Sequence, residues 1–216
     1  MEYFNYFTSG LRVLIDRTSD FIKYYTYSDN DIDESDKSDK SDNSNVLNVK
    51  KRIFVPKPKL EQIQTFFSEP TFIIDNIYLG SAFNASNYNS LKQHNIKMII
   101  NMTNEISNYY NDEILYKKYG LYDNNKQPIA HYFEQTYQDI ITFQNEHPNG
   151  NILIHCFMGA SRSASILTYY IHKKYKLNIN DSIIFIKNKR CIVNLTTLFY
   201  NQLMEIEEKE KNNNYL

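Results

Sequence analysis

The residues most suited to chemistry on an anion lie between positions 152 and 163. This segment reads Ile152-Leu153-Ile154-His155-Cys156-Phe157-Met158-Gly159-Ala160-Ser161-Arg162-Ser163. The apolar run 152–154 predicts a buried strand, and apolar residues at helical spacing after Ser163 predict a helix. The loop between them therefore meets a helix N-terminus, where unpaired backbone N–H groups and the helix dipole attract an anion.

A thiol and a guanidinium stand at the two ends of this loop. The positive field that attracts an anion also lowers the pKa of a cysteine from its usual value of about 8.5, so Cys156 is a candidate thiolate nucleophile. Gly159 lets the loop curl so that successive N–H groups form an anion-binding concavity. Arg162 offers a planar fork that matches two phosphate oxygens. The alternative is that Cys156 is a small buried apolar residue. The fixed offsets that join these three residues with His155 and Ser163 favour attack on a phosphate ester.

The pattern His-Cys-x-x-Gly-x-x-Arg-Ser over 155–163 resembles the signature of the cysteine-dependent protein phosphatases, most of all their dual-specificity branch. The resemblance implies that Cys156 forms a phosphocysteine intermediate. It implies that Arg162 clamps the phosphoryl group, that Ser163 hydrogen-bonds the thiolate and helps it leave, and that His155 orients and tunes the thiol from behind. The phosphate-binding residues that it implies are Phe157, Met158, Gly159, Ala160, Ser161 and Arg162.

A thiolate cannot protonate the leaving oxygen, so a general acid is required. Asp123 is the candidate, in a segment 121–133 whose Asp-Asn-Asn run and proline predict a loop. In the family a similar loop carries an aspartate followed by an isoleucine and a Tyr-Phe pair, which Ile129, Tyr132 and Phe133 match. The same aspartate, once ionised, would activate the water that hydrolyses the intermediate. The alternatives are a solvated turn for Asp123 and Asp112 as the acid.

The resemblance covers about residues 70–208. It includes Ile77-Tyr78-Leu79-Gly80-Ser81 near the start and Gln202-Leu203 near the end. The chain departs from the family at 195–198, where Leu-Thr-Thr-Leu stands in place of a common Pro-Asn-x-Gly. Thr196 thus takes the place of an asparagine that supports the active-site loops. The departure bears on rate and loop rigidity rather than on the type of reaction.

Alternating strand and helix patterns predict an α/β fold with a central mixed sheet of about five strands flanked by helices, as in cysteine phosphatases. We expect strands near 71–79, 97–102, 114–119 and 151–155. We expect helices near 84–94, 130–146, 162–175, 180–189 and 197–210. The domain organisation that we predict is a short amphipathic helix within 1–28, a disordered acidic and then basic linker over 29–59, and a catalytic domain over 68–211.

The N-terminal third differs in composition from the rest. Residues 1–45 contain ten acidic and five basic side chains, whereas the remainder contains fifteen acidic and nineteen basic ones. The acidic low-complexity run 29–45 is too polar to form a core. The mildly basic body suits anionic substrates. The segment Lys50-Lys51-Arg52-Ile53-Phe54-Val55 is either a kinase-docking or nuclear-import segment or a plain linker that leads to Pro56 and Pro58.

Several classes of protein are disfavoured by the composition. The sequence contains no run of eighteen apolar residues, so no membrane-spanning helix is predicted. The start Met1-Glu2-Tyr3-Phe4 lacks the basic and then apolar order of a secretory signal. Two cysteines and five histidines show no metal-ligand spacing, so we expect no metal and no cofactor. Few cysteines favour an intracellular, cytoplasmic location, with the nucleus or, for a viral protein, the host cytoplasm as alternatives. Cys191 is either a core residue or a redox partner of Cys156.

The predicted function is hydrolysis of phosphotyrosine and of phosphoserine or phosphothreonine in proteins. The compact domain implies, by resemblance, a cleft shallow enough for all three. One alternative is an RNA 5′-triphosphatase, whose relatives tend to have threonine where this chain has Ser163. The chain also lacks a strongly basic, aromatic-lined groove, so we expect no nucleic-acid partner. The other alternative is a pseudophosphatase that binds phosphoproteins, although such proteins usually lose the cysteine or the arginine.

Overall fold

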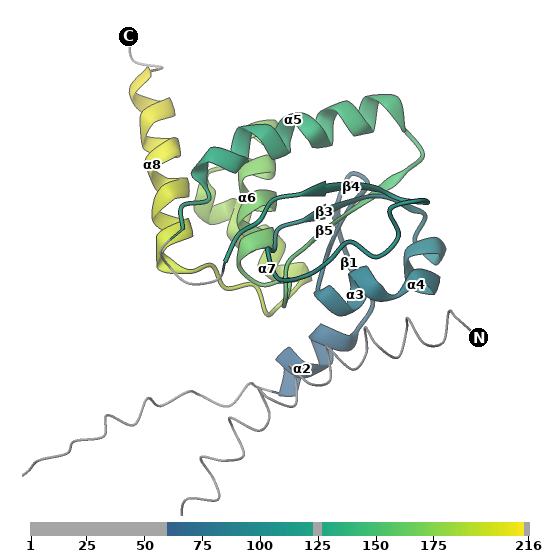
Figure 1. Ribbon diagram of the computed structural model, residues 1–216. Coiled ribbons are helices and arrows are strands. Elements are labelled where there is room, and N and C mark those ends of the chain that lie inside the picture. Colours follow the sequence, from purple (N-terminus) through teal and green to yellow (C-terminus); the bar gives the residue numbers. More distant parts are fainter. Residues whose placement is uncertain (1–59, 123–126, 214–216) are drawn as a thin grey trace, which may run out of the picture. The chain divides into compact units, whose positions relative to one another are not determined.

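The computed structural model describes residues 60–122 and 127–213 of the chain. Its centre is a five-stranded mixed sheet (Figure 1). Its strands are β1 (Thr71–Ile74), β2 (Ile77–Gly80), β3 (Ile96–Asn101), β4 (Leu115–Lys118) and β5 (Asn151–His155). The strand order is β1-β2-β5-β3-β4, with β1 antiparallel to β2 and the other neighbours parallel. This arrangement confirms the predicted mixed sheet and places β5, which leads into Cys156, at its centre.

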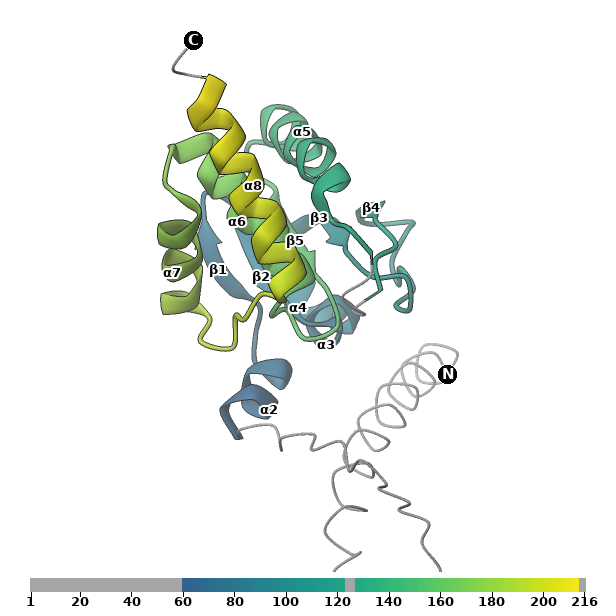
Figure 2. The ribbon, with the colours of Figure 1, turned by 90° about the vertical axis from the view of Figure 1, so that its left-hand side faces the viewer.

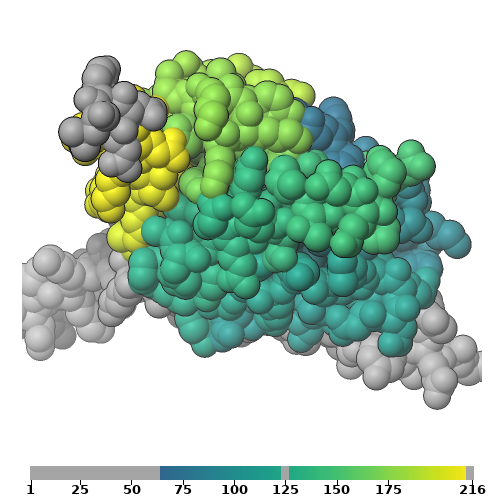
Figure 3. Space-filling view, turned by 90° about the horizontal axis from the view of Figure 1, so that it is seen from above, coloured from purple at the N-terminus to yellow at the C-terminus, as the bar shows by residue number. Residues whose placement is uncertain are grey.

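Helices cover both faces of the sheet (Figure 2). They are α2 (Leu60–Phe67), α3 (Ala82–Ser86), α4 (Tyr88–Gln93), α5 (Ala130–Glu146), α6 (Arg162–Tyr175), α7 (Ile179–Lys189) and α8 (Thr197–Asn213). The larger core lies between one face of the sheet and α5 to α8, and the smaller core lies between the other face and α3 and α4. In the space-filling view of Figure 3, the green surface of α5 and α6 adjoins the yellow surface of α8.

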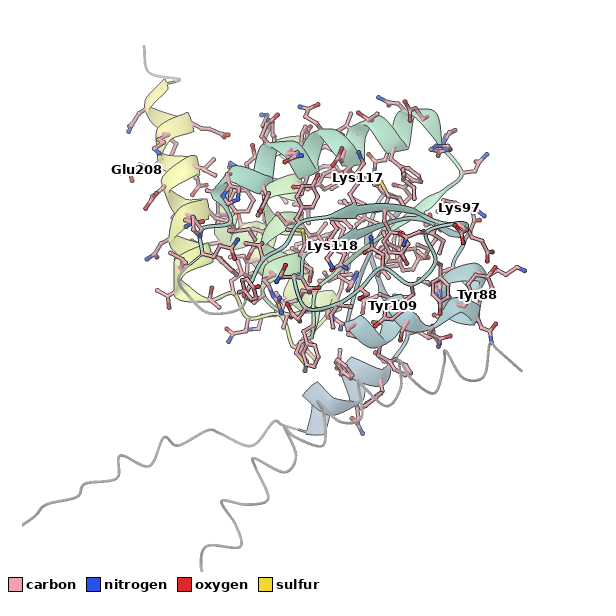
Figure 4. All side chains as sticks on the ribbon, in the orientation of Figure 1. Tyr88, Lys97, Tyr109, Lys117, Lys118 and Glu208 are labelled. Carbon is pink, nitrogen blue, oxygen red and sulfur yellow. The ribbon has the colours of Figure 1, made fainter. Side chains whose placement is uncertain are left out.

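The middle residues of the central strands β3 and β5 are apolar because both faces of these strands are buried. On β5, Ile152 and Ile154 enter the larger core, whereas Leu153 enters the smaller one. On β3, Ile99 enters the smaller core, on which Tyr110 from the loop after β3 packs. The Tyr110 ring also lies 5.1 Å from that of Tyr88 on α4, which Figure 4 labels. Burial on both faces fixes β5 and therefore the start of the loop after it.

Two predicted elements are each divided in the structure. The strand expected over 71–79 is a hairpin, because the chain turns at Asp75 and Asn76, with Asp75 at a φ of 52°. Asparagine and aspartate tolerate such turn conformations. The helix expected near 84–94 is two short helices separated at Asn87, whose extended backbone ends α3 and whose side chain accepts a hydrogen bond from the N–H of Ser90 at the start of α4.

The remaining predicted strands and helices agree with the observed elements to within a few residues. Helix α2 was not predicted; its Phe66 packs on Phe157 of the Cys156 loop, with ring centroids 5.6 Å apart. The predictions for 1–28, 29–59 and the docking segment Lys50–Val55 lie outside the described residues. Among the helices that the structure describes, none has the length and apolar character needed to cross a bilayer.

Candidate active site

The loop between β5 and α6 curls around the sulfur of Cys156. Cys156 follows the last residue of β5, and Arg162 is the first residue of α6. Gly159 has a φ of +71°, and a Cβ atom there would lie 2.4 Å from the carbonyl oxygen of Gly80. Glycine is therefore required at 159 both for the backbone conformation and for the close approach of β2.

The sulfur is buried but receives hydrogen bonds from polar groups. Cys156 is 2% exposed. Its Sγ accepts hydrogen bonds from the backbone N–H of Gly159 and the hydroxyl of Ser163, each at 3.2 Å. A purely apolar cysteine would not need two donors, so these contacts favour a sulfur that carries negative charge.

Every carbonyl group from Cys156 to Ser161 accepts a hydrogen bond from a residue outside that segment. The Cys156 carbonyl accepts from His155 Nδ1 at 3.3 Å, and the Phe157 carbonyl accepts from the Ala82 N–H at 2.9 Å. The Met158 and Gly159 carbonyls accept from Arg190 Nη2 and Nε respectively, both at 3.0 Å. The Ala160 carbonyl accepts from the Asn194 N–H at 2.9 Å, and the Ser161 carbonyl accepts from the Ser165 N–H at 2.8 Å. In a planar trans peptide the N–H of the next residue points opposite to the carbonyl. The N–H groups of 157–162 therefore point to the inner side of the loop, where they form a cradle for an anion.

The pKa of Cys156 lies below its ordinary value. Burial alone raises this pKa, but the charge of Arg162, the Ser163 hydroxyl and the backbone N–H groups of Ser163 and Ala160 together outweigh burial and lower it. A lowered pKa increases the thiolate fraction at neutral pH, and the thiolate is the reactive form.

Arg162 is buried and held in place by acceptors from two other segments. Its side chain is 2% exposed, and Nη1 donates to both carboxylate oxygens of Glu105, at 2.8 and 3.1 Å. Nη1 also donates to the carbonyl oxygen of Leu121 at 2.9 Å. Sequence reasoning missed Glu105, because only its place in the loop after β3, close behind Asn101-Met102-Thr103, could have suggested a role.

His155 is fully buried beneath the loop and electrically neutral. Burial, together with the charges of Arg162 and Lys118, lowers its pKa to about 4 despite the hydrogen bond to the Cys156 carbonyl. Lys118 is labelled on β4 in Figure 4. Because Nδ1 donates to that carbonyl, His155 touches the backbone of Cys156 rather than its sulfur. Nε2 has no hydrogen-bond partner among the described residues.

Asp123 lies outside the described residues, but the ends of its segment are well held. The Gln127 side chain accepts from the N–H of Tyr122 at 3.1 Å and donates to the carbonyl of Gly120 at 3.2 Å. On the far side, the Gln202 side chain accepts from the N–H groups of Ile129 and Ala130, at 2.8 and 3.0 Å. Asp123 follows Leu121 by two residues in the chain, and the Leu121 carbonyl accepts a hydrogen bond from Arg162. The alternative acid, Asp112, is exposed in the turn before β4.

The segment before α8 supports the loop in spite of the departure at Thr196. The N–H of Thr196 donates to Ser161 Oγ at 3.2 Å. The Thr196 hydroxyl is buried and has no hydrogen-bond partner among the described residues.

Both cysteines are free thiols, with Cys156 buried and Cys191 exposed, so the expected core role of Cys191 is wrong.

Residues 77–209 match the family model described as "Dual specificity phosphatase, catalytic domain". Protein phosphatase Slingshot of Drosophila melanogaster is 34% identical over 134 residues, which are 62% of this chain and 13% of that protein. Dual specificity protein phosphatase 1 of Arabidopsis thaliana is 30% identical over 139 residues, 64% of this chain and 69% of that protein. The crystal structure of DUSP15 superposes with a TM-score of 0.59 at 29% identity and covers 63% of this chain and 85% of that one.

The fold, the loop and these similarities define a cysteine-dependent phosphatase domain. The chain belongs to the dual-specificity phosphatase family. The match spans about an eighth of the length of the Drosophila protein.

Proposed function

We propose that this protein hydrolyses phosphotyrosine, phosphoserine and phosphothreonine in protein substrates through a phosphocysteine intermediate. The observation that carries the proposal is the buried Cys156 sulfur, whose pKa is lowered and which faces the inward N–H groups of the loop. Membership of the dual-specificity family supports the range of phosphoresidues. Neither alternative function is favoured by the family match.

In the first step, the Cys156 thiolate attacks phosphorus. The P–S bond forms as the bond to the leaving oxygen breaks, and Asp123 gives that oxygen a proton. The backbone N–H groups of 157–162 and the Arg162 guanidinium hold the three other phosphoryl oxygens. Glu105 and Leu121 orient that guanidinium through Nη1.

In the second step, Asp123 as carboxylate takes a proton from water, which attacks phosphorus and displaces the Cys156 sulfur. Inorganic phosphate leaves, and the sulfur departs as a thiolate. The Ser163 hydroxyl stabilises this thiolate, because its oxygen lies 3.2 Å from the sulfur. His155, neutral and buried, positions the Cys156 backbone through its carbonyl.

Turnover of p-nitrophenyl phosphate tests the proposal. Cys156→Ser should abolish turnover, because a serine hydroxyl has no thiolate form near neutral pH. Cys191→Ser is the matched control, since Cys191 is the other free thiol and is exposed. Wild-type protein without turnover, or turnover that survives Cys156→Ser, would refute the proposed activity. The first of these results would favour a phosphoprotein-binding role.

The acid role of Asp123 has a separate test. Asp123→Ala should slow the first step by about 10²–10⁴-fold while binding is retained, so the variant should hold phosphopeptides without hydrolysing them. Asp112→Ala is the matched control and should keep wild-type turnover. The reverse result would transfer the acid role to Asp112.

Partners and location follow from the same chemistry. Phosphorylated proteins are the proposed partners. The free Cys191 and the thiolate at Cys156 suit a reducing intracellular compartment. Kinase docking through Lys50–Val55 remains a prediction, testable by whether Lys50→Ala with Lys51→Ala weakens binding to a kinase substrate.

A further inference from the structure

Arg190 is a second buried arginine beneath the Cys156 loop, and the mechanism above gives it no part. It ends α7 and is 1% exposed. Nε donates to the carbonyl of Gly159 and Nη2 to that of Met158, both at 3.0 Å. Nη1 reaches the hydroxyl of Thr71 on β1 at 3.2 Å. All three nitrogen atoms therefore have acceptors, and two of these acceptors belong to the loop.

These two contacts set the direction of two peptide planes. Holding the Met158 carbonyl fixes the N–H of Gly159, and holding the Gly159 carbonyl fixes the N–H of Ala160. The Gly159 N–H lies 3.2 Å from the sulfur, and the Ala160 N–H contributes to the lowered pKa of Cys156. One guanidinium fork thus aims two of the donors that face the sulfur. A single-point donor could not hold both carbonyls in this geometry.

The charge of Arg190 has no carboxylate partner within the described residues. Its hydrogen-bond acceptors are two carbonyls and a hydroxyl. Arg162, by contrast, is paired with Glu105 at 2.8 Å. A buried cation without a counterion is costly, so its retention calls for an anion nearby. Burial lowers the pKa of Arg190 to about 10, and the charges of Cys156 and Cys191 oppose that shift, so Arg190 stays protonated at neutral pH.

We propose that Arg190 is a positioning residue for phosphoryl transfer: its fork aims the Gly159 and Ala160 N–H groups, and its unpaired charge keeps Cys156 ionised before substrate binds. The inference rests on the proposed function, because it assigns Arg190 a role in that same reaction. The other charged group that acts on the ionisation of Cys156 is Arg162 from α6, which is itself paired with Glu105. His155 from β5 is neutral, and Ser163 adds an uncharged hydrogen bond.

Two substitutions separate the fork from the charge. Arg190→Lys keeps the charge but cannot bridge both carbonyls, whereas Arg190→Gln keeps a hydrogen-bonding amide but loses the charge. Lys189→Met is the matched control. It removes a positive charge from the residue next to Arg190. The Lys189 Nζ donates to the carbonyl of Ile73 at 2.5 Å and lies 5.5 and 4.8 Å from the ring centroids of Phe72 and Phe185.

The first measurement is the rate at which iodoacetamide alkylates Cys156 across pH 5 to 9, read by mass spectrometry of the peptide that contains it. Arg190→Gln should slow alkylation at pH 6 on the order of tenfold, because its thiol titrates at higher pH. Arg190→Lys should slow it less than Arg190→Gln does, because it keeps the charge and disturbs only the aim of the N–H groups, and Lys189→Met should match the wild type at that pH. Arg190→Gln with the wild-type pH profile would overturn the inference.

The second measurement is protection of Cys156 by inorganic phosphate, which reports on the cradle without any turnover. Arg190→Lys should weaken protection on the order of tenfold through the misaimed N–H groups, and Lys189→Met should leave it unchanged. Unchanged protection in Arg190→Lys would overturn the role of the fork. If Arg190→Gln does not melt cooperatively, Arg190→Lys alone decides, because it must weaken protection by phosphate while Lys189→Met does not. Both readouts stand even if the wild type fails to turn over substrate, so failure of the proposed function is distinguishable.

Discussion

Removal of the Ser163 hydroxyl should separate the two chemical steps. Ser163 is fully buried, and its Oγ lies 3.2 Å from the Cys156 sulfur. In Ser163→Ala the sulfur loses its one side-chain donor within the described residues, while Arg162 and the loop N–H groups remain. The loss matters most where the sulfur carries full negative charge, which is when it leaves phosphorus in the second step.

The magnitude follows from the type of hydrogen bond. A hydrogen bond to a charged group contributes about 1.5–3 kcal/mol, so its loss should slow breakdown of the phosphocysteine about 10–100-fold. Formation of the intermediate should slow less, since attack consumes the charge that the hydroxyl stabilises. The loss also raises the pKa of Cys156, because a group that favours the thiolate is gone.

Stopped-flow release of p-nitrophenol provides the assay. Ser163→Ala should give a rapid burst of about one equivalent of product per enzyme, followed by a slow steady state. The matched control is Ser165→Ala, which removes a buried hydroxyl of the same helix that bonds the Ser161 carbonyl at 2.9 Å. A Ser163→Ala enzyme with wild-type turnover, or one that is slow without a burst, would refute the reasoning.

Three further predictions concern the loop and its surroundings. Gly159→Ala should lower the free energy of unfolding by about 2–4 kcal/mol in urea titrations, because its φ of +71° and a carbonyl 2.4 Å from the added Cβ both oppose alanine; Gly120→Ala, which meets only a side chain at 3.1 Å, should cost far less. Glu105→Gln removes the negative charge beside Arg162, so the pKa of Cys156 should fall further and alkylation at pH 5 to 6 should speed up several-fold; an unchanged rate would contradict the electrostatic account. The folded pKa of His155, about 4, lies below its ordinary 6.5, so its contribution to stability is present above pH 6.5 and is lost as pH falls to 4. The difference in unfolding free energy between wild type and His155→Gln should therefore change by about 3 kcal/mol across that interval, and a constant difference would show that His155 does not titrate as described.

The strand, loop and helix around Cys156 were predictable because the signals are local. An apolar run, a glycine and a helical repeat follow one another within about twenty residues, and each has its own physical cause. The divided elements were harder. The turn at Asp75 and the break at Asn87 interrupt apolar patterns that continue across them. The periodicity therefore predicted one strand and one helix where the structure has two strands and two helices.

The supports of the site were not predictable in the same way, because they join residues far apart in the chain. Glu105 pairs with Arg162 across 57 positions, and Arg190 reaches Gly159 across 31. Gln202 was recognised in a motif, but its bonds to the start of α5 depend on how α8 packs. A single sequence shows none of these pairings, since each depends on the sheet order that brings the segments together.

Acid-quenched mass spectrometry during turnover tests the central claim most directly. With Ser163→Ala and p-nitrophenyl phosphate, the peptide that contains Cys156 should carry the mass of one phosphoryl group, and the adduct should be absent when Cys156 is also changed to serine. Steady hydrolysis with no phosphoryl group on that peptide, or with the group on another residue, would contradict the account.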